Sequence, residues 1–158
     1  MKKKIVFIMN PISGTSSKAA VPSLIDSTLD KEQFEYEIKM TERPGHASEL
    51  AAEARDNHAD IVVAVGGDGT VNEVARSLVH SDSALGILPC GSGNGLARHL
   101  LLPMNLKKSI EIINACKIHD LDYGVINEYP FFCTCGMGFD AFVSMKFAES
   151  GKRGPISY

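Results

Sequence analysis

The sequence predicts an α/β domain with a parallel-rich sheet and helices on both faces. Two observations carry this prediction. Short apolar runs alternate along the chain with helical segments of roughly ten residues, which is the pattern of βαβ units. The run 61–65 (IVVAV) is apolar at every position, as expected of a strand covered on both faces.

The first half of the chain contains three predicted strands and two helices. Residues 4–9 (KIVFIM) form an apolar strand that ends at the turn signal Asn10-Pro11, and residues 21–29 place apolar side chains at helical spacing. Residues 34–40 (FEYEIKM) alternate apolar and charged residues, which predicts a half-exposed strand. The alanine- and glutamate-rich segment 46–57 predicts the helix before the buried strand at 61–65.

The second half continues the alternation. A helix over 71–79 follows a glycine turn, the apolar segment 85–88 predicts a strand, and 106–115 has the spacing of an amphipathic helix. We also expect two strands, over 118–126 and 130–135, joined by a turn around Asn127-Glu128, and a last helix over 139–148. The chain stops soon afterwards without a closing polar tail, so we expect it to be the first domain of a longer protein.

Composition limits the possible partners and settings. A net charge of −3 argues against a nucleic acid partner, and no run approaches the ~20 apolar residues of a membrane span. The apolar stretch after Lys2–Lys4 is too short for a signal peptide. The histidines and the four cysteines lack the spacing of a metal site, and we expect buried free thiols in a reducing, cytoplasmic protein.

The segment 66–73 (GGDGTVNE) is the strongest functional signal. Gly66, Gly67 and Gly69 let the backbone approach a bound group closely, and a helix expected to start at Thr70 offers free N–H groups. A strand, a glycine turn and a helix N-terminus together predict an anion site, most often for phosphate. Neither the Walker pattern nor the dinucleotide pattern G-x-G-x-x-G occurs in the chain.

Two acidic residues in this turn have competing interpretations. Asp68 can orient a cation or a substrate hydroxyl, or it can cap the helix that follows. Thr70-x-x-Glu73 matches a capping box, so Glu73 either satisfies the N–H of Thr70 or contributes to the site. Both alternatives stay open for each residue.

A second glycine-rich loop, 91–95 (GSGNG), has the same character. Gly91 and Gly93 permit close approach, Ser92 can donate to a phosphate oxygen, and Arg98 follows one helical turn after Asn94. Because ligands bind at the carboxyl ends of parallel strands, we expect four loops to meet in one crevice. These loops begin at or near Asn10, Thr41, Gly66 and Gly91.

Together these segments resemble the catalytic domain of the diacylglycerol kinase family, which includes bacterial lipid kinases, sphingosine kinases and ceramide kinases. The fold that the resemblance implies is shared with NAD kinases. The matching segments are Asn10-Pro-Ile-Ser-Gly14, Thr41 with Gly45-His46-Ala47, Gly66–Glu73, Pro89–Asn94, Asp122-x-Gly124 and Gly138-Phe-Asp-Ala141.

The resemblance implies ATP and Mg²⁺ as cofactors and a second, β-rich domain that supplies the metal ligands and an acidic motif, so the present chain is not expected to be fully active alone. Asp68 would be catalytic, Asp140 would lie near the lipid hydroxyl, and Lys152 and Arg153 would lie close to the phosphates. The implied nucleotide contacts are Asn10, Ser13, Thr41, Gly66, Gly67, Asp68, Gly69, Thr70, Val71, Asn72, Glu73, Gly91, Ser92 and Asn94.

We therefore expect a kinase that phosphorylates a lipid hydroxyl and meets that lipid at the membrane surface. Many bacterial members carry T-x-N-D where this chain has Ser92-Gly93-Asn94-Gly95, a version closer to the sphingosine kinase branch, so the identity of the lipid stays open. The alternatives are an NAD kinase-like enzyme and a non-catalytic nucleotide-binding module. An apolar face left for a second domain could also let the chain form a homodimer.

Overall fold

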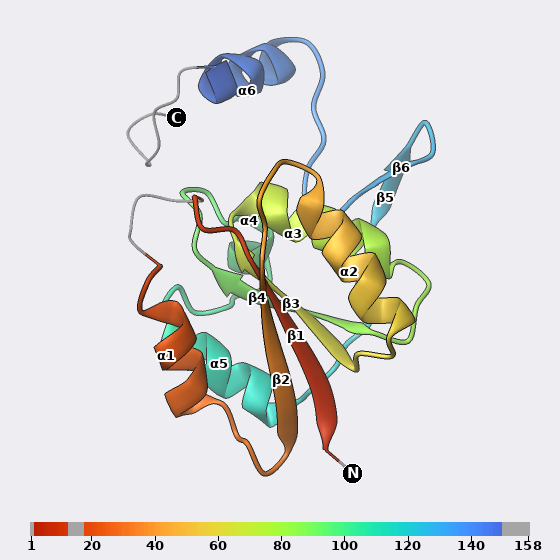
Figure 1. Ribbon diagram of the computed structural model, residues 1–158. Helices are drawn as coiled ribbons and strands as arrows, with labels where there is room; N and C mark the ends of the chain where they lie inside the picture. Colours follow the sequence, from red (N-terminus) through yellow and green to blue (C-terminus); the bar gives the residue numbers. More distant parts are fainter. Residues whose placement is uncertain (1, 13–17, 150–158) are drawn as a thin grey trace.

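The computed structural model describes residues 2–12 and 18–149 and contains a central sheet of four parallel strands in the order β2-β1-β3-β4 (Figure 1). The strands are β1 (Lys3–Met9), β2 (Phe34–Met40), β3 (Ile61–Gly66) and β4 (Ala84–Pro89). Helices cover both faces of this sheet, so the predicted fold class is confirmed.

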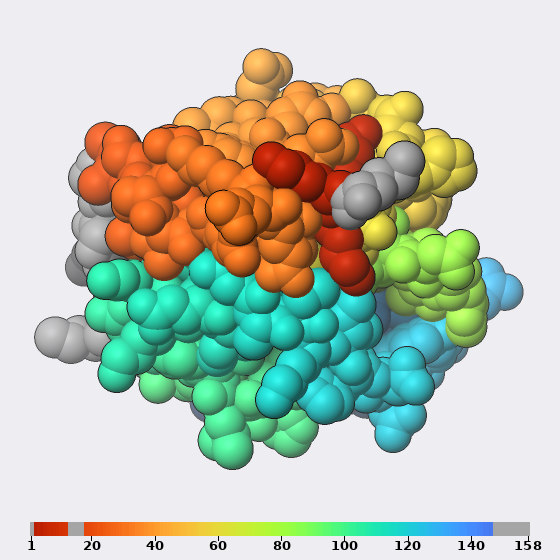
Figure 2. Space-filling model, turned by 90° about the horizontal axis from the view of Figure 1, so that it is seen from below, coloured from red at the N-terminus to blue at the C-terminus, as the bar shows by residue number. Residues whose placement is uncertain are grey.

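The helices form two groups, one on each face. On one face lie α1 (Val21–Thr28) and α5 (Leu106–Ala115), which Figure 2 shows side by side in orange and teal. The other face is covered by α2 (His46–Asp56), α3 (Asp68–Leu78) and the short α4 (Gly95–His99).

The strands send alternate side chains to the two helical layers. In β1, Val6 and Ile8 pack toward α2 and α3, whereas Ile5, Phe7 and Met9 pack toward α1 and α5. All five side chains are buried. A strand that is apolar on both faces is therefore what a sheet covered on both sides requires.

The register of the sheet brings four loops to one edge. Met9 of β1 pairs with Met40 of β2 and Val65 of β3, while Gly66 of β3 pairs with Pro89 of β4. Because all four strands are parallel, the residues that follow them lie along the same edge of the sheet. The crevice expected there from the sequence thus has its four loops in place.

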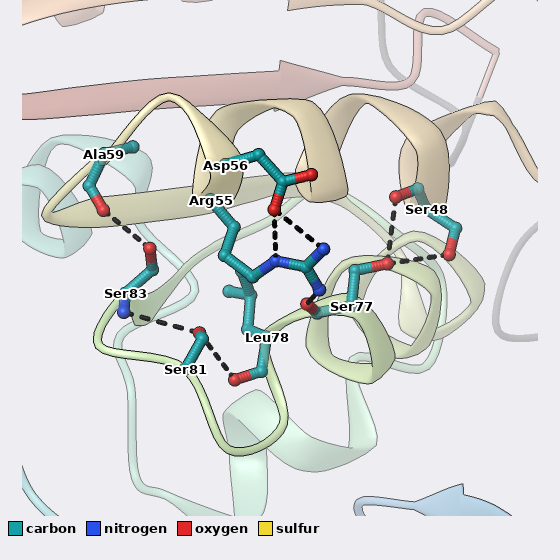
Figure 3. A network of polar contacts seen from close by, with 8 residues as sticks. All are labelled: Ser48, Arg55, Asp56, Ala59, Ser77, Leu78, Ser81 and Ser83. Atoms are coloured by element: carbon teal, nitrogen blue, oxygen red, sulfur yellow. Dashed lines mark hydrogen bonds and ion pairs between the residues drawn. The ribbon is translucent and has the colours of Figure 1, made fainter.

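Polar contacts hold α2 and α3 together (Figure 3). The Ser48 and Ser77 hydroxyls lie 2.8 Å apart, and Ser77 Oγ also donates to the Ser48 carbonyl at 2.9 Å. Arg55 Nη1 donates to the Ser77 carbonyl at 2.7 Å. These contacts fix α3 against α2, and α3 in turn carries the glycine turn at its N-terminus.

The region after α5 differs from the prediction. Instead of strands over 118–126 and 130–135, it contains a short antiparallel hairpin of β5 (Gly124–Ile126) and β6 (Tyr129–Phe131). The turn expected at Asn127-Glu128 is confirmed, and both residues have positive φ (45° and 71°), as in the type I′ turn of a two-residue hairpin. The rest of the two segments forms no strand, since it lies along the surface without a neighbouring strand to pair with.

The cysteines of this region also correct an expectation. Cys133 and Cys135 are exposed and lie outside any strand, while Cys90 and Cys116 are half-buried. All four are free thiols, as predicted, but they are not buried.

The last described helix, α6 (Phe139–Glu149), stands apart from the sheet in Figure 1. None of the helices in the described part of the chain is long and apolar enough to cross a membrane.

Candidate functional site

The two glycine-rich turns touch each other through their backbones. A Cβ atom added to Gly91 would collide with Gly67 Cα, and one added to Gly67 would lie 3.1 Å from Gly91 Cα. From the sequence, these glycines were expected to let a ligand approach the backbone. In the structure, the backbone of each glycine instead lies against the backbone of the other.

Asp68 joins the same two turns. Its carboxylate accepts hydrogen bonds from Asn94 N at 2.8 Å and from Gly95 N at 2.5 Å. These N–H groups stand at the N-terminus of α4, so Asp68 caps α4. The capping alternative raised from the sequence named the wrong helix, because the side chain crosses to the neighbouring turn.

Asn94 closes its own loop. Its Oδ1 accepts from Gly91 N and its Nδ2 donates to Gly91 O, both at 2.8 Å. The residue is buried and has left-handed backbone (φ 54°), a conformation that asparagine tolerates better than most residues. Hereafter, the loop junction means Gly67, Asp68, Gly91, Asn94 and Gly95.

The other two glycines of the first turn differ from each other. A Cβ on Gly66 would overlap the side chain of Thr70, which is buried and accepts a hydrogen bond from Asn10 Nδ2 at 3.4 Å. A Cβ on Gly69 would meet no atom within 4 Å, and Gly69 is exposed. Gly69 is therefore the glycine of this turn that the fold itself does not require.

Helix α3 begins at Asp68 with Gly67 as its N-cap, two residues before the expected start. The capping box from Thr70 to Glu73 is consequently wrong, because Glu73 now lies beyond the first turn. Glu73 instead accepts from Gly45 N at 3.1 Å and from Ala47 N at 3.2 Å. It thereby caps α2, the helix that follows the Thr41 loop.

A cavity of about 350 Å³ opens beside the second glycine loop. Its wall includes Lys18, Cys90, Ser92 and Arg98, together with part of the loop backbone. Arg98 Nε donates to Gly93 O at 2.9 Å, which holds the guanidinium at the loop. Two cationic side chains and a hydroxyl thus line one cavity at the carboxyl end of the sheet.

Lys18 is the site residue that the sequence analysis missed. Its side chain is buried at the edge of the loop after β1, and its ammonium donates to Asn10 O at 2.6 Å. Burial lowers the pKa of Lys18, and burial raises the pKa of the Cys90 thiol beside it, an effect that the lysine charge opposes. The available signal was a lone lysine at the end of a Ser/Gly-rich loop.

The remaining candidates fall into three groups. Asn10 and Thr41 lie at the same edge of the sheet, with Thr41 buried and Asn72 half-buried on α3. The Val71 side chain lies in the core. Asp140 is exposed in the first turn of α6, the helix that stands apart from the sheet in Figure 1.

Three further candidates, Ser13, Lys152 and Arg153, lie outside the described residues. Within the described ranges, no group of three or more His, Cys, Asp or Glu side chains could hold a metal ion.

Comparisons with known proteins agree with this architecture. A sequence model described as the diacylglycerol kinase catalytic domain matches residues 4–126. A diacylglycerol kinase of Staphylococcus saprophyticus is 32% identical over an alignment that covers 100% of this chain and 53% of the relative. A diacylglycerol kinase of Staphylococcus epidermidis is 31% identical, with 100% of this chain and 51% of the relative covered.

A solved structure supports the fold. The crystal structure of a diacylglycerol kinase from Bacillus anthracis superposes with a TM-score of 0.70 at 24% identity. The match covers 82% of this chain and 48% of that protein. The chain spans about half the length of the curated relatives it matches.

Proposed function

The chain belongs to the diacylglycerol kinase catalytic domain family, and from this premise we propose that it is the nucleotide-binding part of an ATP-dependent lipid kinase. The observation that carries the proposal is the loop junction. Two glycine turns from neighbouring strands meet at the carboxyl ends of a parallel sheet, where such folds bind their ligands.

The cavity beside the junction has the chemistry that phosphate groups need. Lys18 and Arg98 supply positive charge, Ser92 supplies a hydroxyl, and the glycine loop supplies backbone close to the cavity. A partly buried cation pairs more strongly with an anion than an exposed one, because water screens the pair less. The proposed nucleotide therefore lies with its phosphates between Lys18, Ser92 and Arg98.

ATP supplies the γ-phosphoryl group: the lipid hydroxyl oxygen forms the new P–O bond as the bond to the departing ADP breaks, and the hydroxyl proton leaves along its hydrogen bond to Asp68. Asp68 is proposed to receive a hydrogen bond from that hydroxyl and to orient it. The carboxylate can do so while it accepts two amides, because its two oxygens offer about four lone-pair positions.

We propose that Mg²⁺ binds together with the nucleotide, through the phosphates. Among the described residues, no group of three or more His, Cys, Asp or Glu side chains could hold a metal ion, and Mg²⁺ in kinases is commonly held by substrate phosphates with few protein ligands. No residue of the described ranges is therefore proposed as a metal ligand.

The test is a side-by-side assay of the full-length protein with radiolabelled ATP and three acceptors: diacylglycerol, a sphingoid base and NAD. Label transfer to a lipid supports the proposal, and transfer to NAD alone would favour the NAD kinase-like alternative. Binding of ATP without transfer to any acceptor would leave a nucleotide-binding module.

The role of Asp68 is tested by Asp68→Asn, with Asp82→Asn as the matched control at an exposed carboxylate. We expect the first substitution to abolish label transfer while ATP affinity stays close to that of the unmodified protein. The control should change neither. Full turnover in Asp68→Asn would remove this residue from the mechanism.

A further inference from the structure

Helix α4 ends in a left-handed residue that is a leucine. Leu101 N donates to Arg98 O at 3.0 Å and Leu102 N donates to Ala97 O at 2.8 Å, the paired bonds of a Schellman motif. In that motif the residue after the C-cap takes left-handed backbone and is usually glycine. Here it is Leu101, with φ 56° and a side chain that is 89% exposed.

The fold itself does not account for Leu101. The apolar contact that accompanies the motif comes from Leu102, which packs against the core on the α2–α3 side of the sheet. Glycine would take the same backbone conformation without the crowding between Cβ and the carbonyl oxygen that leucine suffers. A residue that is strained in the fold and exposed to water points to a use outside the fold.

Leu101 belongs to a projecting segment, residues 100–104, which we call the apolar loop. Leu100 and Met104 in this loop are also exposed, at 38% and 37%. Figure 2 shows the green atoms of the segment around residue 100 standing out from the lower edge of the molecule, beside the teal α5. Three large apolar side chains thus reach solvent within five consecutive residues.

Positive charge flanks the apolar loop. No Asp or Glu occurs between Asp82 and Glu111, although the whole chain carries a net charge of −3. Arg98 precedes the loop, Lys107 and Lys108 follow it, and all three are exposed. The ion pairs found among the described residues lie elsewhere on the surface.

We propose that the apolar loop is a membrane contact. Leu101 enters the boundary between headgroups and acyl chains of an anionic bilayer, and Lys107 and Lys108 pair with lipid phosphates. An apolar tip with a cationic flank fits such a surface, whereas a second copy of this chain would bring two positive flanks together. The choice of a bilayer rests on the proposed lipid substrate.

The apolar loop also adjoins the candidate site. Met104 lines the cavity, and its sulfur lies 3.9 Å from Asn94 Nδ2 in the loop junction. A membrane contact at this loop would therefore set the cavity beside the lipid surface. This placement brings a membrane-bound acceptor to the same edge of the domain as the proposed phosphate site.

The test is sedimentation of the full-length protein with vesicles of phosphatidylcholine that contain phosphatidylglycerol, in the absence of ATP. Leu101→Gly should lower vesicle affinity roughly tenfold, the scale of burying one leucine side chain. It should leave the midpoint of urea unfolding equal or higher, since glycine relieves the left-handed strain. The pair Lys107→Glu and Lys108→Glu should lower affinity by at least roughly tenfold.

Two matched controls lie at the other end of α5. Ile118→Gly removes an apolar side chain that is 59% exposed, and Lys117→Glu reverses an exposed charge. Neither should change vesicle affinity. Unchanged vesicle binding in Leu101→Gly would overturn the proposal. The proposal would also fail if the unmodified protein does not bind vesicles but self-associates, and Leu101→Gly abolishes that self-association.

Phosphorylation of a short-chain diacylglycerol dispersed in detergent separates this inference from the proposed function. Loop variants that keep this activity and lose vesicle binding support both. Vesicle binding through the loop without phosphorylation of any lipid would contradict the proposed function and leave the membrane contact standing.

Discussion

The loop junction and the open side of the site contain the same residue types in different roles. At the junction, Gly67 and Gly91 are glycines because two backbones touch, and the Asp68 carboxylate is engaged with two amides. The open side means Gly69, where an added Cβ would meet no atom within 4 Å, and the cavity residues Lys18, Ser92 and Arg98. The difference teaches that a glycine motif can hold a site together as well as receive a ligand.

The sharpest test of this difference is Gly91→Ala, which places a methyl group against Gly67 Cα. Gly67 Cα belongs to the backbone and cannot move aside easily, so we expect the free energy of unfolding to fall by about 2–3 kcal/mol. Urea unfolding followed by circular dichroism measures this change. An unaltered midpoint would mean that the two turns are not in contact in solution.

Gly69→Ala is the matched variant on the open side. Its new methyl group meets no atom, and alanine in the first turn of α3 should leave stability equal or raise it by up to ~1 kcal/mol. If the open side receives phosphate, ATP affinity measured by titration calorimetry should nevertheless fall. Equal ATP affinity in this variant would move the nucleotide away from the first glycine turn.

Asp68→Asn should have an intermediate effect on stability. An asparagine oxygen can accept from only one of the two amides comfortably, because its NH₂ group then faces the other donor. The loss of one hydrogen bond to a charged acceptor should lower the free energy of unfolding by about 1–2 kcal/mol. Urea unfolding tests this value, and a more stable variant would contradict the capping of α4.

The sheet, its buried strands and the meeting of four loops could be predicted from the sequence, because alternating strand and helix patterns indicate a parallel sheet whose strands end at one edge. The apolar run 61–65 marked a covered strand by itself, and Asn127-Glu128 marked the hairpin turn. The strands expected over 118–126 and 130–135 were wrong in extent, since apolar residues there have no neighbouring strand to pair with.

Partners within the site were harder to predict, because they lie far apart in the chain. The spacing of Thr70 and Glu73 indicated a local capping box, yet Glu73 reaches Gly45 and Ala47 on another helix. Asp68 likewise meets residues of a different turn. Local sequence patterns therefore indicate which residues belong to the site but not which of them bind each other.

Glu73→Ala should cost less than either junction substitution. It removes the acceptor for two N–H groups at the N-terminus of α2, and such a cap contributes about 1 kcal/mol. Glu49→Ala, which breaks an exposed ion pair with Arg43, is the control and should change stability by less than ~0.5 kcal/mol. Equal effects in the two variants under urea unfolding would leave Glu73 without a capping role.

The smallest expected effect comes from Lys18 on the open side. Burial lowers the pKa of Lys18 in the folded protein below the ordinary value of 10.5. At pH values below the folded pKa, the charged Lys18 therefore lowers the free energy of unfolding. As pH rises from the folded pKa toward 10.5, the unfolded chain binds the extra proton, and the free energy of unfolding should therefore rise. Lys18→Met should remove this rise, which urea unfolding across alkaline pH measures. A phosphate ligand favours the charged lysine, so saturating ATP should flatten the same rise in the unmodified protein, and a slope that ATP leaves unchanged would separate Lys18 from the nucleotide.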